Sequence, residues 1–212
     1  MTEKTVLSPE PQFASVIYTI QKPDFLSDVS VAVDGLLQRA KAAVTLNEVY
    51  PVYMTETLSG NPKALALEQF IAESAWAILS DQGYRMEDYV THVSEFWAQE
   101  HHKHSGMDQH VHPHGVVLSG FYFLKAPENG CMVEIHDPRP GKVQASLPPR
   151  DLSKVTAANN SLLIKPQPGM AIFTNSWLPH SFTRNASNEP VTFIHFNVSV
   201  RPAERPAEPI VV

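Results

Sequence analysis

The spacing of apolar residues changes near residue 88 of this 212-residue chain. Before that point, apolar residues recur at intervals of three and four, which is the period of a helix with one buried face. After it, apolar and β-branched residues form short runs separated by glycine, proline and asparagine, as in strands joined by turns. The pattern predicts a helical region followed by a β-rich region.

Two helices are expected in the first 88 residues. The first begins at Ser27 or Asp28, either of which can cap it. The second opens with Asn61 and Pro62, an N-cap followed by a proline at the first helical position. Residues 14–20 predict a strand, and the stretch between the two helices is rich in turn-forming residues.

Six apolar runs after residue 88 predict strands, at residues 89–100, 115–124, 131–136, 161–166, 169–175 and 190–200. Many short strands separated by glycine and proline turns favour a sandwich or a jelly-roll barrel. Residues 201–212 are charged and interrupted by proline, which predicts an extended tail. We therefore expect one mainly β domain over residues 1–212, with a helical support region (1–88), a β-barrel core (89–200) and the tail.

Composition and charge narrow the possible partners. The net charge is −6 without a long basic run, which argues against nucleic acid as a partner. No stretch approaches eighteen consecutive apolar residues, which argues against a membrane span. Cys131 is the only cysteine, and the N-terminal residues lack the apolar core of a secretion signal. We expect a cytoplasmic protein, with its oligomeric state left open.

Candidate chemistry begins with the histidines, six of which lie within residues 101–115, HHKHSGMDQHVHPHG. Imidazole is the commonest metal-binding side chain, although a solvated loop is the alternative. Residues two apart on a strand point to the same face, so His110 and His112 can bind one ion together. His114 is a reserve candidate, because Pro113 places it near a turn. The other three histidines are expected to flank the site: His101, His102 and His104.

Two imidazoles leave a catalytic metal with too few ligands, so a third is expected from another strand. The downstream candidate is His180, within PGMAIFTNSWLPHSFTRN. It follows a predicted strand and a short loop. A single histidine in such a place is more often a surface or core residue. The sequence motifs around His180 therefore decide whether it is a candidate metal ligand.

Those surroundings carry a family resemblance. The runs HVHPHGVVLSGFYFLKAPENGCMVEIHDPR, PQPGMAIFTNSWLPHSFTRN and PVTFIHFNVSV resemble the iron(II)- and 2-oxoglutarate-dependent oxygenases, in the branch related to prolyl hydroxylases. The resemblance covers roughly residues 95–200. It implies a double-stranded β-helix, a jelly-roll barrel that holds its metal at one open end. The matching segments are His110–Pro113, Ser119–Leu124, Asp137–Arg139, Gly169, Phe173, Ser176–His180 and Phe196–Asn197.

The resemblance implies that Fe(II) is held by His110, His112 and His180. Its usual triad contains two histidines and one carboxylate, with open positions for cosubstrate and oxygen. His112 stands where many relatives have the carboxylate. A carboxylate from elsewhere in the chain is therefore an alternative, and the candidates are Asp108, Glu134 and Asp137.

The cosubstrate site departs from the family in a second way. Relatives commonly have an arginine early in the last strand, where it would form a bidentate pair with the far carboxylate of 2-oxoglutarate. The matching residue here is Val191. Other residues are candidates to bind the cosubstrate in its place, and they are Tyr122, Arg139, Arg184, His195 and Asn197.

Three functions follow from these features. The first is a non-haem Fe(II) dioxygenase that hydroxylates a small molecule or a peptide while it consumes 2-oxoglutarate. The second is a cupin-like metalloenzyme with three histidine ligands that does not use 2-oxoglutarate, which His112 and Val191 favour. The third is a barrel that binds a ligand or metal without catalysis, because this fold hosts many functions.

Overall fold

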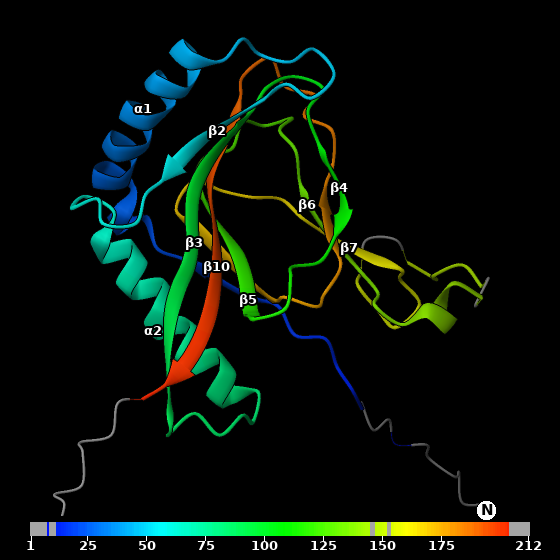
Figure 1. Cartoon of the computed structure of the whole chain (residues 1–212). Helices are drawn as coiled ribbons and strands as arrows, with labels where there is room; N and C mark the ends of the chain where they lie inside the picture. Colours follow the sequence, from blue (N-terminus) through cyan, green and yellow to red (C-terminus); the bar gives the residue numbers. More distant parts are fainter. Residues whose placement is uncertain (1–7, 9–11, 145–146, 152–153, 204–212) are drawn as a thin grey trace, which may run out of the picture.

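The computed structural model describes residues 8, 12–144, 147–151 and 154–203, and shows two facing sheets with helices outside the larger one (Figure 1). Its elements, in chain order, are β1 (Tyr18–Gln21), the 3-10 helix η1 (Pro23–Phe25), α1 (Leu26–Ala43), β2 (Val52–Thr57), α2 (Leu65–Asp81), β3 (Tyr89–His101), β4 (Met107–His110), β5 (Val116–Lys125), β6 (Val133–His136), the 3-10 helix η2 (Pro140–Gln144), β7 (Ser161–Ile164), β8 (Met170–Asn175), β9 (His180–Phe182) and β10 (Val191–Pro202).

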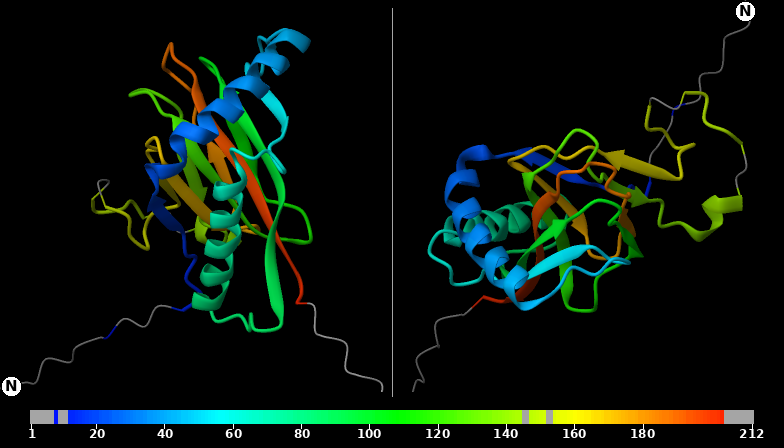
Figure 2. Two further views of the ribbon diagram at one scale, coloured as in Figure 1. Left: turned by 90° about the vertical axis from the view of Figure 1, so that its left-hand side faces the viewer. Right: turned by 90° about the horizontal axis from the view of Figure 1, so that it is seen from above.

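The larger sheet has six strands in the order β1-β8-β5-β10-β3-β2, and the smaller has four in the order β4-β9-β6-β7. Every neighbouring pair for which a register is defined is antiparallel. Figure 2 shows both helices on one side of the larger sheet and the smaller sheet on the other. The predicted mainly β, two-sheet architecture with helical support is confirmed.

Strand β10 lies at the centre of the larger sheet and is buried on both faces. Its even-numbered residues, such as Ile194 and Phe196, belong to the hydrophobic core shared with the helices. Its odd-numbered residues Val191 and Phe193 belong to a second core, between the two sheets. Successive side chains of a strand point to opposite faces, so this one strand contributes to both cores.

The two helices cover the larger sheet because each has one apolar stripe. In α1, Val33 and Leu37 are among the residues packed in the core, and in α2, Ile71 and Ala75 are.

The N-caps of the two helices are Phe25 and Ala64, without a side-chain hydrogen bond, so the predicted starts of both helices are wrong. Asn61 instead begins the turn before α2, where its Oδ1 accepts a hydrogen bond from the Lys63 N–H at 3.0 Å. The pattern of apolar spacing predicted the buried faces, whereas the exact helix starts depend on the turns that precede them.

Several strands were not predicted from the sequence. Strand β2 occupies the stretch between the helices and pairs with β3, so the first 88 residues supply sheet as well as helix. The short strands β4 and β9 were also missed. Of the predicted tail, Arg201 and Pro202 continue β10, and residues 204–212 lie outside the described residues.

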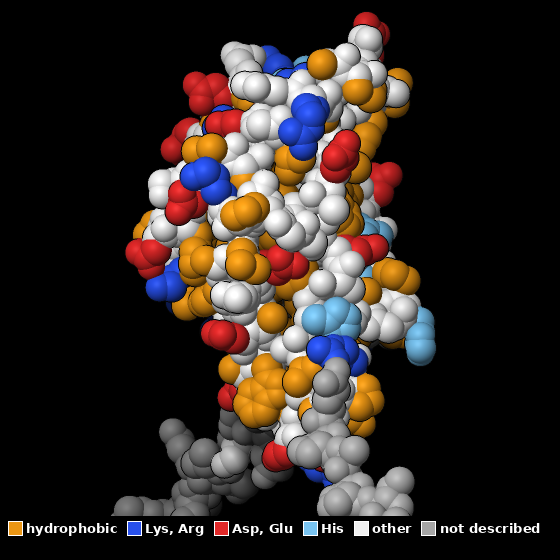
Figure 3. All heavy atoms as spheres, turned by 60° about the vertical axis from the view of Figure 1, so that its left-hand side comes forward, with side chains coloured by type: hydrophobic (Ala, Val, Ile, Leu, Met, Phe, Trp, Pro, Cys, Tyr) orange, Lys and Arg blue, Asp and Glu red, His pale blue; other side chains and the backbone are white. Residues whose placement is uncertain are grey.

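The surface seen from the helical side carries scattered charges rather than a single charged area. In Figure 3, acidic side chains are interspersed with single basic and apolar ones, and no continuous basic area is visible on this face. The view agrees with the net charge of −6. Within the described residues, no helix has the length and apolarity needed to span a membrane.

Gly120 is required by the close packing of β5 against its neighbours. A Cβ atom at this position would lie 2.2 Å from the carbonyl oxygen of Ile172 and 2.4 Å from the ring of Phe196. We expect Gly120→Ala to destabilise the protein by about 1–3 kcal/mol or more, because backbone atoms cannot move aside as a flexible side chain can. Urea unfolding monitored by circular dichroism measures this change.

Gly35, inside α1, provides the matched control. A Cβ atom there meets nothing within 4 Å. Gly35→Ala is expected to stabilise the protein by about 0.5–1 kcal/mol, since glycine weakens a helix interior. Equal unfolding midpoints for the two alanine variants would contradict the packing described for Gly120.

Candidate metal centre

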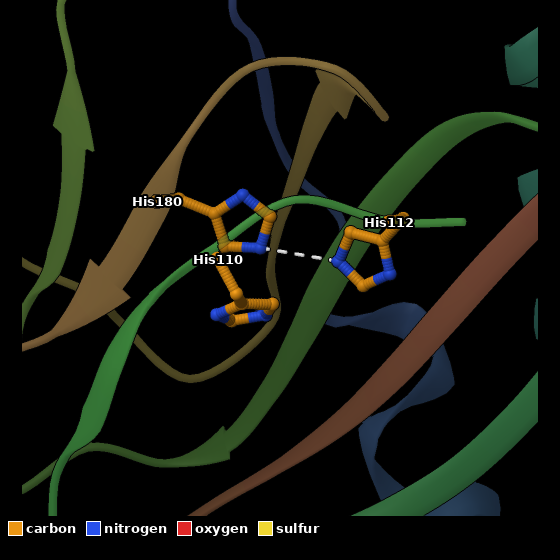
Figure 4. A group of neighbouring side chains, drawn as sticks. All are labelled: His110, His112 and His180. Carbon is orange, nitrogen blue, oxygen red and sulfur yellow. Dashed lines mark hydrogen bonds between the residues drawn. The ribbon is translucent and has the colours of Figure 1, made fainter. Parts of the chain in front are cut away.

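Three histidines from two strand ends meet between the sheets (Figure 4). His110 ends β4, His112 follows two residues later, and His180 opens β9. In the pairing of β4 with β9, His110 lies opposite His180. One ring nitrogen from each histidine lies within 4.8 Å of the other two, and Nε2 of His112 is 3.2 Å from Nε2 of His180. This spacing suits three nitrogens directed at one metal ion.

The second ring nitrogens are held in place by the backbone. Nδ1 of His180 donates to the carbonyl of Leu178 at 3.0 Å, and Nδ1 of His110 donates to the carbonyl of Asp108 at 2.9 Å. A carbonyl oxygen can only accept, so both rings carry their proton on Nδ1 and direct the lone pair of Nε2 toward the centre. Such outer hydrogen bonds fix the tautomer and orientation of metal-binding histidines.

Burial keeps the imidazoles of His112 and His180 neutral. Desolvation, with a smaller contribution from neighbouring histidines, lowers the pKa of His112 to about 4. Desolvation likewise lowers the pKa of His180 to about 4. A metal ion binds the neutral ring, so both side chains offer a lone pair at neutral pH.

One side of the triad is polar. Ser119 Oγ lies 2.9 Å from Nε2 of His112, and Asn197 faces Ser119 across the β5–β10 pair. The ring of His195 lies 5.1 Å from that of His112 and stacks on Trp97 at 4.4 Å. We call Ser119, His195 and Asn197 the polar wall. All three are at least 96% buried, with exposed fractions of 0%, 4% and 1%.

Two atoms of the polar wall lack hydrogen-bond partners among the described residues. They are Nδ1 of His195 and Oδ1 of Asn197, and both are buried. Nδ2 of Asn197 donates to the Glu95 carboxylate, so only its oxygen is left over. An unpaired buried polar atom costs free energy, so these atoms are suited to contact a ligand that the protein binds beside the metal.

The other side of the triad is apolar. The ring of Phe121 lies 5.7 Å from that of His180 and 5.6 Å from that of Phe193. Phe182 stacks on Phe193 at 4.8 Å. We call the set formed by Phe121, Phe123, Phe182, Val191 and Phe193 the apolar wall, and all its members are at least 96% buried.

The structure brings two of the five predicted cosubstrate residues to the centre, His195 and Asn197. Tyr122 points to the helical side of β5, where its hydroxyl donates to the Lys22 carbonyl. Arg139 pairs with Asp137 at 2.6 Å on the exposed loop after β6. Arg184 is exposed, and its guanidinium donates to the His104 carbonyl.

The alternative carboxylates are not brought to the triad either. The exposed Asp108 contributes its backbone carbonyl to His110, not its side chain. Glu134 accepts a hydrogen bond from Ser161, and Asp137 binds Arg139. Among the described residues, the group able to hold a metal consists of histidines alone.

The remaining histidines of residues 101–115 separate into buried and exposed positions. His101 is fully buried between the sheets, where Nε2 bonds to Gln99 at 2.9 Å. His102 is bound to Glu100, which also pairs with Lys41 of α1. His104 and His114 are exposed. His101 and His102 therefore support the packing of β3 rather than the approach to the metal.

Ser119 and Trp97 were missed as site residues in the sequence. Both lie in predicted strands, and strand alternation could have found them. Ser119 shares its face of β5 with Phe121, and Trp97 lies opposite His195 in the β3–β10 pairing. Which face turns toward the metal was not visible until the strands were paired.

The comparisons with known proteins agree with this geometry. Residues 95–197 match the family model described as "Putative 2OG-Fe(II) oxygenase". The match spans 103 of the 212 residues and includes all three histidines of the triad. The matched family is one of oxidoreductases, and it implies Fe(II) as cofactor and 2-oxoglutarate as cosubstrate. None of the curated proteins matches the chain in sequence.

Solved structures share the fold at low sequence identity. AviO1 from Streptomyces viridochromogenes matches with a TM-score of 0.61 and 17% identity, over 92% of this chain and 93% of that one. A prolyl hydroxylase from Trichoplax adhaerens, in complex with a peptide fragment, matches with a TM-score of 0.57 and 12% identity, over 86% and 83%. The α-ketoglutarate-dependent epimerase SnoN matches with 0.59 and 15%, over 87% and 80%. These likenesses confirm the double-stranded β-helix of the oxygenases.

The buried histidines predict how the stability of the metal-free oxygenase depends on pH. Burial lowers the pKa of His101, His112 and His180 to about 4 and that of His195 to about 3. Between about pH 6.5 and 4 the unfolded chain binds protons that the folded chain does not. The free energy of unfolding is therefore expected to fall as pH falls through this window, by up to about 1.4 kcal/mol per pH unit for each histidine.

Urea unfolding at a series of pH values measures this dependence, and His195→Phe provides the matched variant. Phenylalanine can keep the stacking on Trp97 while it removes one titrating ring. The variant is expected to show a shallower pH dependence than the natural chain. A free energy of unfolding that stays constant between about pH 7 and 5 would contradict the assignment of neutral, buried rings.

Proposed function

We propose that His110, His112 and His180 hold the Fe(II) ion of this oxygenase through their Nε2 atoms. The convergence of one nitrogen from each ring within 4.8 Å supports the assignment most strongly. The backbone hydrogen bonds to Nδ1 of His110 and His180 support it further. Three protein ligands on one face leave open positions, and an Fe(II) ion held in this way supplies the activation of molecular oxygen.

A set of three neutral ligands affects how the centre attracts its cosubstrate. No carboxylate of the described residues joins the triad, so both positive charges of the metal would remain uncompensated by the protein. An anionic group of the cosubstrate is then attracted by charge as well as by coordination. We assign the recognition of the 2-oxo acid head group to the metal ion for this reason.

We further assign the polar wall to the positioning of the molecule bound beside the metal. With the lone pair of His112 Nε2 committed to a metal, the Ser119 hydroxyl, now 2.9 Å from that nitrogen, would be free to donate to that molecule. Nδ1 of His195 and Oδ1 of Asn197 are unpartnered already. The three groups stand next to one another on β5 and β10, so one bound molecule could contact all of them.

The reaction proposed is the hydroxylation of an unidentified small molecule or peptide. Two structural neighbours support keeping both substrate classes open. One is a prolyl hydroxylase in complex with a peptide fragment, and the other is an epimerase of nogalamycin biosynthesis. A cytoplasmic location is part of the proposal, and the single cysteine, the buried Cys131, supports a reducing compartment.

Single substitutions in the triad test the metal assignment. His112→Ala and His180→Ala are each expected to weaken Fe(II) binding by at least about 100-fold, more than loss of an outer hydrogen-bond partner costs. Anaerobic isothermal titration with Fe(II) measures the affinity. His114→Ala is the matched control, because His114 is exposed and lies two residues beyond His112. Unchanged affinity in His180→Ala would remove that residue from the ligand set.

Turnover of the cosubstrate tests the catalytic proposal. The Fe(II)-loaded protein is expected to release succinate from 2-oxoglutarate in the presence of oxygen, even without its substrate, at a slow uncoupled rate. His180→Ala should abolish the release and His114→Ala should leave it unchanged, with succinate measured by chromatography. Succinate release that persists in His180→Ala at the natural rate would refute the role of this centre.

The second candidate is a three-histidine metalloenzyme that does not use 2-oxoglutarate. The observation that favours it is Val191, which stands where relatives commonly have an arginine for the far carboxylate of 2-oxoglutarate. Val191 lies in the apolar wall with no exposed surface. Binding of Fe(II) by the triad together with failure of any 2-oxo acid to bind the loaded protein would support this candidate over the first.

A further inference from the structure

Among the described residues, the interior around the candidate metal centre holds no lysine or arginine that could receive a carboxylate. The buried polar and charged residues of the described chain include neither lysine nor arginine. The nearest candidates by sequence, Arg139 and Arg184, are exposed and already bound to Asp137 and to the His104 carbonyl. The far carboxylate of 2-oxoglutarate would therefore find no cationic partner between the sheets.

The only titratable group of β3 that faces the apolar wall does not replace an arginine. His101 lies opposite Val191 in the β3–β10 pairing, and its ring is 5.1 Å from that of Phe193. Its Nε2 donates to Oε1 of Gln99, which leaves Nδ1 as an unpartnered lone pair. A lone pair repels a carboxylate rather than binding it.

The polar wall is also unsuited to a second carboxylate. The unpartnered oxygen of Asn197 is an acceptor, and its amide nitrogen is bound to the carboxylate of Glu95. An anion placed at Asn197 would meet an acceptor and a negative charge, whereas the Ser119 hydroxyl lies beside His112 and would serve the head group at the metal. An uncharged aliphatic chain of a cosubstrate would not be repelled by these groups. Its burial against the apolar wall would be favourable.

We propose that this site selects 2-oxo acids by the head group that binds the metal and gives no preference to a second carboxylate. Monocarboxylic 2-oxo acids with an apolar chain, such as 2-oxopentanoate, would then serve as well as 2-oxoglutarate. This inference rests on the proposed function, because it assumes that the triad binds Fe(II) and that the metal receives the head group. The inference adds monocarboxylic 2-oxo acids to 2-oxoglutarate, the cosubstrate that the matched family implies.

Anaerobic isothermal titration of the Fe(II)-loaded full chain with 2-oxoglutarate and with 2-oxopentanoate tests the proposal. The two acids have the same chain length and differ in the far carboxylate. We expect the dissociation constant of 2-oxopentanoate to equal that of 2-oxoglutarate within about threefold, or to be lower. A dissociation constant for 2-oxoglutarate that is lower by more than this factor would overturn the inference and leave the proposed function standing.

Failure of the proposed function gives a different result. If neither acid binds the Fe(II)-loaded protein, both the inference and 2-oxo acid use are wrong. If both acids bind His180→Ala as tightly as the natural chain, the binding does not depend on the triad and both are wrong as well. His114→Ala is expected to bind both acids with natural affinity.

An arginine placed in the apolar wall provides an independent test. In Val191→Arg, a guanidinium would supply the missing partner, and we expect 2-oxoglutarate to bind tighter by roughly tenfold or more relative to 2-oxopentanoate. Val191→Leu keeps the wall apolar and should leave the ratio of the two dissociation constants unchanged. If Val191→Arg folds and the ratio does not change, the apolar wall is not where the far end of the cosubstrate lies, and the inference is overturned. The comparison of the two acids on the natural chain needs no variant to fold.

Discussion

The antiparallel pairing of β10 between β3 and β5 is the constraint on which the rest of the structure depends. Strand β10 is buried on both faces, and its successive side chains alternate between the core against the helices and the space between the two sheets. Ile194 and Phe196 belong to the core that joins the larger sheet to the helices. His195 and Asn197 are directed by the same alternation into the space between the sheets. A shift of one residue in register would exchange the two sets and destroy both the core and the site.

The candidate metal centre depends on a second pairing, that of the short strands β4 and β9. It places His110 opposite His180 and brings together side chains that lie 70 positions apart in the chain. The loop after β4 is held by the hydrogen bond from the His112 backbone N–H to the Ser176 carbonyl at 2.9 Å. Backbone contacts therefore position all three imidazoles. The low pKa values of His112 and His180 follow from their burial, and a metal ion would find both rings neutral.

The charges around this centre decide how it would treat an anionic ligand. The triad is neutral, the polar wall is neutral, and the described interior holds no lysine or arginine. An ion bound there would be the dominant charge of the whole site. Recognition of an anionic cosubstrate would then come from the metal, while the walls would decide the shape and polarity of what lies beside it. The same Phe121 and Phe193 that build the core thus limit the chemistry of the ligand.

The sequence by itself determined the mainly β class, the faces of both helices, seven of the ten strands in the described chain and the three histidines that meet. Each of these follows from local spacing or from a family resemblance carried by short motifs. Only the tertiary structure decided which polar residues reach the centre. His195, Asn197 and Ser119 do, whereas Tyr122, Arg139 and Arg184 do not. The reason is physical: alternation gives a strand two faces, and the pairing of distant strands, which no local pattern encodes, decides which face turns inward.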